Sequence, residues 1–270
     1  MTVAAVDRCL SLIEALAGAR EPQELSALAA KVGLPNSAAH RILSTLAARG
    51  WVVQEPTTHA YALSLRLSVL ALRNLEAHAV PNVVQKVLDD LAARTGEYCR
   101  LAVVEQEDLI WVARAQGATV GLRYEPDMGQ EIVLHATANG KAWLASMQEA
   151  DAARILRERG IDASRPLGPN CLTDEADVLR DLGVARAKGF ATAVEEAEAG
   201  AAAVAVVFRA APEEEAPVAG TVSVAGPLMR FPAERHEALA VELREAAEEL
   251  SSVWPLRQFA RTASNHGSSQ

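Results

Sequence analysis

Five polar residues lie close together near the N-terminus, and their types suit contact with the edges of DNA bases. They belong to the stretch LPNSAAHRILSTLAARGWV, residues 34–52. An asparagine can bond an adenine edge and an arginine a guanine edge through two hydrogen bonds each, whereas serine tolerates either base. The five residues are Asn36, Ser37, His40, Arg41 and Ser44.

The elements around this stretch favour a winged helix-turn-helix. Ala39, Leu43 and Leu46 follow helical spacing and form one apolar stripe, so the polar residues fall on the opposite side. We expect this helix to begin near Pro35 or Asn36 and to end at Gly50. Two other helices precede it, and the second of them stops at Gly33, so that the turn between them has only two residues. Two β-prone runs, WVVQ and AYAL, flank the turn EPTTH and predict a hairpin.

In a winged helix-turn-helix the second helix of the motif enters the major groove, which is the position of residues 36–41 here. Thr57 and Thr58 in the predicted wing could bond phosphates, which orient a protein on DNA without reading its sequence. A single helix of this composition would more often be a surface helix that turns its polar side to water. The full succession of helices, short turn and hairpin favours DNA binding.

Charge and cysteine content narrow the class of protein. The formal net charge is −9 over 270 residues, yet residues 1–75 carry seven Lys/Arg against five Asp/Glu, and the remainder carries 19 against 30. This asymmetry fits a small anion-binding module on an acidic body. Three scattered cysteines predict neither a disulfide framework nor a zinc site. With no signal peptide or spanning segment in the sequence, we expect a cytoplasmic protein without a cofactor or membrane partner.

The remainder of the chain predicts a connecting helix and a larger α+β domain. Residues 64–80 continue as a helix until Pro81 interrupts the pattern. Beyond Gly96 we expect strands at 98–104, 109–117 and 119–123 around the charged turn EQED, then helices, one of them capped by Thr173. A hairpin around APEEEAP and a last helix from Pro232 to Val253 complete the domain. The expected divisions are a winged helix at 1–66, a linker helix at 67–80, an effector domain at 81–257 and a disordered tail at 258–270.

Several segments together resemble the IclR family of bacterial transcriptional regulators. They are LPNSAAHRILSTLAARGWV, YALSLRLSVLA, LDDLAARTGEYCRLAVVEQEDLIWVARAQG and, most specifically, LHATANGKAWLAS. The resemblance runs from about Val3 to Val253. It implies an N-terminal winged helix, a linker helix used in dimerisation, and a GAF-like C-terminal domain built on an antiparallel sheet that binds a small effector. Family members act on operator DNA as repressors or activators, as dimers or dimers of dimers.

The resemblance also locates an effector pocket at the LHATANGK segment. Thr137 can cap a helix beginning near Ala138, and the N–H groups of a first helical turn favour an anion such as a carboxylate. We predict effector contacts from Tyr124, Ile132, Ala138, Asn139, Gly140, Ala203 and Ser223.

The chain departs from the family where side chains commonly contact the effector. Alanine stands at 193, 202 and 203, where an acidic residue, an arginine and a cysteine are frequent, and Ala225 replaces a second serine. We therefore expect a metabolite carboxylate or largely apolar ligand, held by apolar contact and backbone amides. Ala38 replaces a frequent hydroxyl residue on the reading helix, so its operator should differ from familiar ones.

Two other classes of function remain open. An enzyme could use His135 near Thr137 and Lys141, but no nucleophile, phosphate loop or metal spacing accompanies this histidine. The other candidates are the adjacent carboxylates Glu195 and Glu196, but adjacent residues on an extended strand point to opposite faces. A protein-interaction module could use the winged helix as a docking surface. We expect no catalytic or metal site.

Overall fold

The computed structural model divides the chain into two compact units, residues 1–77 and 78–270. It describes residues 3–19, 21–77, 80–126, 129–161 and 166–254, and the tail expected at 258–270 lies outside these ranges. Within the described residues, none of the helices is both long and apolar enough to cross a bilayer.

The first unit begins with the expected three helices: α1 (Ala4–Ala17), α2 (Leu25–Lys31) and α3 (Asn36–Ala48). The start of α3 is confirmed, but the turn before it is longer than the two residues expected. Helix α2 ends at Lys31 rather than at Gly33, so residues 32–35 form the turn, with Gly33 in the left-handed region at φ 65°. Glycine suits this position because it has no Cβ to clash.

The predicted wing is present as two short antiparallel strands, β1 (Val52–Gln54) and β2 (Tyr61–Leu63). Gln23 adds a bridge to the far side of β2 through two backbone hydrogen bonds of 2.8 Å with Tyr61. The core of this unit gathers residues from all three helices and both strands: Leu12, Ala15, Leu16, Leu28, Leu43, Leu46, Val52 and Tyr61.

Two helices follow the wing. Helix α4 (Arg66–Ala77) belongs to the first unit, and α5 (Val80–Thr95) begins the second. Pro81 is the second residue of α5. Proline is tolerated there because the first turn of a helix has no partner for its backbone N–H groups.

The second unit is built on one five-stranded antiparallel sheet in the order β4-β3-β7-β6-β5. The strands are β3 (Tyr98–Glu105), β4 (Asp108–Gln116), β5 (Ala191–Val194), β6 (Ala201–Arg209) and β7 (Val218–Pro227). The β6–β7 hairpin around the acidic loop is confirmed. Strand β5 ends at Val194, so the extended strand expected at Glu195 and Glu196 stops before both residues.

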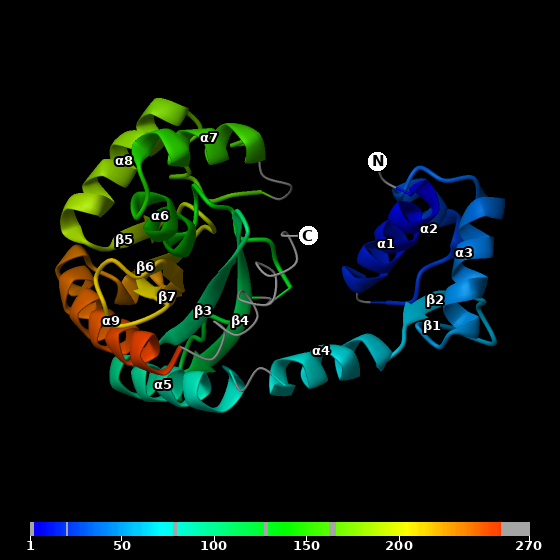
Figure 1. Ribbon diagram of the computed structural model, residues 1–270, viewed down its shortest axis with the longest axis horizontal. Helices are drawn as coiled ribbons and strands as arrows, with labels where there is room; N and C mark the ends of the chain where they lie inside the picture. Colours follow the sequence, from blue (N-terminus) through cyan, green and yellow to red (C-terminus); the bar gives the residue numbers. More distant parts are fainter. Residues whose placement is uncertain (1–2, 20, 78–79, 127–128, 162–165, 255–270) are drawn as a thin grey trace, which may run out of the picture. The chain divides into compact units, whose positions relative to one another are not determined.

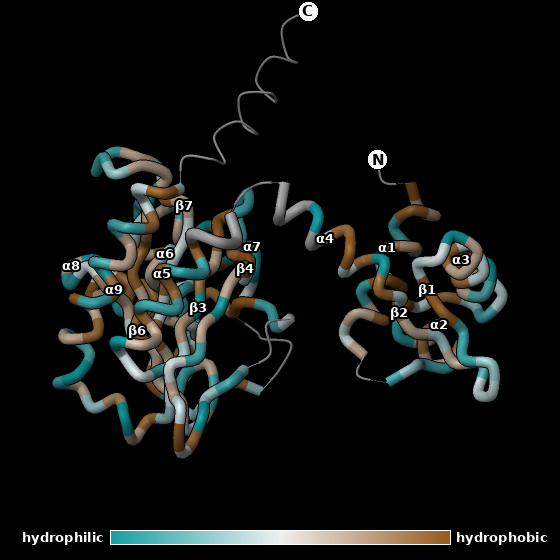
Figure 2. Tube along the Cα trace, turned by 90° about the horizontal axis from the view of Figure 1, so that it is seen from below, coloured by the Kyte–Doolittle hydropathy of each residue, from teal (hydrophilic) through white to brown (hydrophobic). Residues whose placement is uncertain are grey.

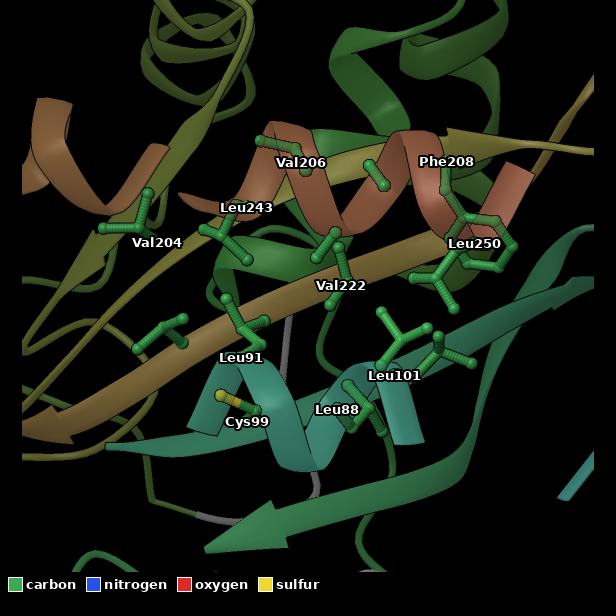
Figure 3. Close-up of a cluster of buried hydrophobic side chains, with 14 of the residues drawn as sticks. Leu88, Leu91, Cys99, Leu101, Val204, Val206, Phe208, Val222, Leu243 and Leu250 are labelled. Atoms are coloured by element: carbon green, nitrogen blue, oxygen red, sulfur yellow. The ribbon is translucent and has the colours of Figure 1, made fainter. Parts of the chain in front are cut away.

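Helices cover both faces of this sheet (Figure 1). Helices α5 and α9 (Ala233–Val253) pack on one face, where Leu91, Leu101, Val222 and Leu243 meet in a large apolar core (Figure 3). The other face carries α6 (Ala138–Ala145), α7 (Glu149–Arg159) and α8 (Glu175–Lys188). A short 3-10 helix, η1 (Leu228–Arg230), precedes α9.

Two local predictions in this unit are wrong. Residues 119–123 form no strand, because Gly121 adopts φ 78° and interrupts an extended backbone, and the Leu122 carbonyl accepts from Arg230 at 2.8 Å instead of joining a ladder. The N-cap of α8 is Asp174 rather than Thr173. The Asp174 carboxylate accepts from the N–H of Ala176 at 2.9 Å, and a charged acceptor at this end also suits the helix dipole.

Candidate functional site

The predicted DNA-reading residues share one exposed edge of α3. Its apolar stripe is buried in the core of the first unit, so the opposite edge of the helix is left to solvent. Figure 2 shows hydrophilic and hydrophobic positions alternating along this helix. The exposed residues are Asn36, Ser37, His40, Arg41 and Ser44. Their arrangement offers amide, hydroxyl and guanidinium groups to a partner along about two turns.

The two threonines of the wing are also exposed, in the turn between β1 and β2. The Thr58 hydroxyl donates to the Glu55 carboxylate and accepts from the N–H of Ala60 at 3.3 Å. Its side chain therefore shapes the turn, in which His59 has φ 59°. Thr57 is exposed as well and could reach a phosphate, although the Glu55 carboxylate in the same turn would repel one.

The second unit contains a cavity of about 50 Å³, measured as the space open to the centre of a water molecule, between the sheet and the start of α6. Five strands and three connecting or helical segments contribute to its wall, which is a mixture of aromatic, charged and very small side chains. The lining residues are Arg100, Trp111, Tyr124, Gln130, Glu131, Thr137, Ala138, Asn139, Ala193, Ala197, Glu198, Ala201, Ala202, Ala203, Ser223 and Ala225.

Strand register brings the sheet residues of this wall together. Arg100 on β3 stands opposite Ser223 on β7, and Ala225 stands opposite Ala203 on β6. Directly opposed residues of antiparallel strands point to the same face, so all four side chains lie on the α6 side of the sheet. Residues more than a hundred positions apart thereby share one wall.

Arg100 is the main cavity residue that sequence reasoning missed. It is only 9% exposed, and its guanidinium stacks 4.1 Å from the ring centroid of Trp111 and 5.5 Å from that of Tyr98. An arginine in this setting keeps its charge and presents a planar fork of donors suited to a carboxylate. The signal was available, because it is the single charged residue in the alternating run YCRLAVV.

Tyr124 joins two sides of the cavity. The charges of Arg100 and Glu198 both act on its phenol, and its backbone carbonyl accepts from Gln116 at 3.0 Å. Burial raises the pKa of Tyr124, the negative charge of Glu198 raises it further, and the Arg100 charge opposes both. The phenol is therefore neutral at physiological pH and can donate a hydrogen bond.

The start of α6 forms the far wall and is built as predicted. The Thr137 hydroxyl accepts from the N–H of Gly140 at 3.1 Å, which confirms it as the N-cap. The N–H groups of Ala138 and Asn139, in the first turn, have no partner within the helix. The Asn139 side chain donates to Thr221 at 2.9 Å, and this bond anchors α6 to β7.

Five of the seven predicted effector contacts line the cavity, and two lie behind its wall. Ile132 is buried in the apolar core between the sheet and α6. Gly140 packs against the backbone of Leu134, where even a Cβ atom would lie 2.3 Å from the carbonyl oxygen. The alanines that replace frequent family contacts, at 193, 202, 203 and 225, all line the cavity and leave room in it.

The residues considered for catalysis lie outside this wall. His135 is 2% exposed, and burial, with the charge of Lys141, lowers its pKa. Lys141 is engaged by Glu196 and Asp181. Glu195 and Glu196 follow β5 in a loop rather than lying on the extended strand that was expected. Among the described residues, no group of three or more His, Cys, Asp or Glu could hold a metal ion.

A helix-turn-helix with an exposed polar edge, together with a sheet domain that encloses a cavity, is the architecture of a transcriptional regulator with a separate sensing domain. Residues 5–56 match the family model described as "IclR helix-turn-helix domain", and residues 72–252 match "Bacterial transcriptional regulator IclR C-terminal". The chain belongs to the IclR family of bacterial transcriptional regulators.

Individual relatives agree with this assignment over nearly the whole chain. The transcriptional repressor IclR of Escherichia coli K12 is 27% identical over 93% of this chain and 90% of its own. A crystal structure of an IclR-type regulator from Alicyclobacillus acidocaldarius has a TM-score of 0.78 at 26% identity, covering 93% of this chain and 98% of that one. An IclR homologue from Microbacterium hydrocarbonoxydans, crystallised with 4-hydroxybenzoate, has a TM-score of 0.71 at 25% identity, covering 92% and 97%.

Proposed function

We propose that this protein is a DNA-binding regulator whose operator affinity is controlled by a small carboxylate with an apolar, aromatic body, bound in the cavity of the second unit. The observation that carries the ligand class is Arg100, largely buried and stacked on Trp111 in the cavity wall. A guanidinium and the start of α6 both favour an anion, and the aromatic rings favour a flat apolar body. The 4-hydroxybenzoate bound by the Microbacterium relative has these properties.

The proposed regulator is a homodimer or a dimer of dimers that acts in the cytoplasm, where it presents two α3 helices to operator half-sites about 34 Å apart or a multiple of that distance. The exposed apolar side chains of α4, among them Leu67, Val69 and Leu70, support pairing through this helix. We keep residues 67–80 as the linker between a winged helix and an effector domain. Coupling of about 1–3 kcal/mol between the sites would change operator affinity about 5- to 150-fold.

The same proposal assigns no reaction to the chain, because its relatives are named as regulators and the candidate catalytic residues lie outside the cavity wall. A protein-docking role for the winged helix makes a different prediction. Binding to DNA releases counterions from phosphates, so affinity for an operator should fall steeply with salt.

The test of DNA reading is fluorescence anisotropy on a duplex taken from upstream of the gene that encodes this chain. Arg41→Ala should weaken specific binding by about 1–3 kcal/mol, and Arg49→Ala, at the exposed C-terminal end of α3, serves as the matched control. If the two variants bind this duplex with equal affinity, Arg41 is not among the residues that read the DNA sequence.

The test of the cavity is calorimetric titration with 4-hydroxybenzoate. Arg100→Gln should lose about 1.5–3 kcal/mol of affinity, roughly tenfold to a hundredfold, while keeping its affinity for DNA. Arg114→Gln, on the neighbouring strand and outside the cavity, should bind as the parent does. If the Arg100 variant binds 4-hydroxybenzoate as tightly as the parent, the ligand does not bind at Arg100.

A further inference from the structure

One wall of the cavity is a loop that depends on a buried ion pair. The β5–β6 loop (residues 195–200) contributes Ala197 and Glu198 to the lining. The alanines at 193 and 201–203, on the strands it connects, line the cavity as well. The position of this loop therefore sets the width of the cavity and places Glu198 against Tyr124.

Lys141 reaches this loop from the opposite side. Its side chain is 2% exposed, and its ammonium donates to both carboxylate oxygens of Glu196, at 2.7 and 2.9 Å, and to Asp181 on α8 at 2.7 Å. Lys141 lies in α6, whose first two residues, Ala138 and Asn139, line the cavity. One ammonium group thus joins two walls of the cavity to α8.

The backbone of the loop is held in a strained form. Glu195 has φ 53°, an unfavourable region for a side-chain-bearing residue. Its carbonyl accepts from the N–H of Asn170 at 3.0 Å, and the carbonyl of Glu196 accepts from the N–H of Gly168 at 2.8 Å. This approach requires a glycine, because a Cβ at position 168 would lie 2.1 Å from the Glu195 carbonyl oxygen. Such a conformation persists only where the surroundings enforce it.

We propose that Lys141 and Glu196 are positioning residues for the effector cavity, and that their ion pair holds the β5–β6 loop in the conformation that receives the ligand. The identity of the ligand in this inference rests on the proposed function. The role of the ion pair in holding the loop does not depend on it. Asp181 contacts the same ammonium without belonging to the loop, and its side chain is partly exposed. It therefore provides a control in which Lys141 loses one anionic partner while the loop keeps its own.

The experiment compares Glu196→Gln with Asp181→Asn in the full chain, by amide hydrogen exchange and by titration with 4-hydroxybenzoate. Gln preserves the shape of the buried group but removes its charge. In the Glu196 variant, amides of residues 194–201 should exchange about tenfold faster or more, because local opening becomes easier. Affinity for 4-hydroxybenzoate should fall about tenfold, since the loop must then be ordered on binding. The Asp181 variant should stay within about twofold on both measures.

Three results would overturn the proposal: unchanged exchange at 194–201 in Glu196→Gln, faster exchange with unchanged affinity, or an acceleration that spreads equally to α9. Lys141→Met provides a second perturbation of the same pair and should give the same pattern. If the parent binds no 4-hydroxybenzoate, the proposed ligand class fails, and the exchange measurement alone decides: acceleration confined to the loop supports the positioning role.

Discussion

A pair of glycine substitutions tests how tightly the start of α6 is packed. A Cβ atom at Gly140 would lie 2.3 Å from the carbonyl oxygen of Leu134 and 2.4 Å from its Cα. Both atoms are backbone, so no change of rotamer can relieve the contact. Gly183, within α8, is the matched control, because a Cβ there would meet no atom within 4 Å.

The expected free energies of unfolding move in opposite directions. In Gly140→Ala the new carbon must retreat by at least about 0.7 Å to reach 3.0 Å, the shortest separation that Cβ atoms show, and by about 1.1 Å to reach ordinary contact at 3.4 Å. Such a movement displaces α6 or the segment before it. Overpacking of this kind costs about 1–3 kcal/mol, against a helix-propensity gain of about 1 kcal/mol. Because the obstruction is rigid we expect a net loss of about 2 kcal/mol. Gly183→Ala should gain about 0.5–1 kcal/mol, since it keeps only the propensity term.

The assay is urea unfolding followed by tryptophan fluorescence. In a Trp51→Phe background the remaining tryptophans, at 111, 143 and 254, all report on the second unit. Gly140→Ala should also bind 4-hydroxybenzoate less tightly, because the displaced residues line the cavity. A Gly140→Ala variant as stable as the parent would refute the packing argument, as would an equal loss at position 183.

Two further predictions concern buried ionisable groups. Glu97, 2% exposed, accepts from Arg230 at 2.7 and 2.8 Å and from Arg235 at 2.9 Å, so Glu97→Gln should cost about 3–5 kcal/mol in urea unfolding. Glu242→Gln, which breaks a half-exposed pair, should cost at most about 1 kcal/mol, and similar costs for both would contradict the role of burial. Burial lowers the pKa of His135 in the folded chain below the ordinary histidine value of 6.5. As the pH falls, the unfolded chain therefore takes up this proton before the folded chain does. Stability should therefore fall as pH drops from 7.5 to 5.5, and less in His135→Leu; a parallel fall in both would exclude His135 as the cause.

Local sequence was sufficient for the elements whose signals lie within a few residues. The stripe of Ala39, Leu43 and Leu46 predicted α3 because helical periodicity needs no distant partner. Thr137 was recognised as a cap for the same reason, since its acceptor lies three residues from the N–H it satisfies. These features, with the resemblance to the family, located the polar edge of α3 and five lining residues of the cavity.

Tertiary structure decided what depends on strand pairing and on contacts between distant segments. The run at 119–123 has strand-like composition, but no strand in the described part of the chain pairs with it, and a positive φ at Gly121 breaks it. Arg100 became a cavity residue only when register placed it beside Ser223, and Lys141 was paired only when folding brought Glu196 to α6. Sequence periodicity indicates which face a residue occupies, whereas the charge, width and anchoring of the cavity arise from groups that meet only in the folded chain.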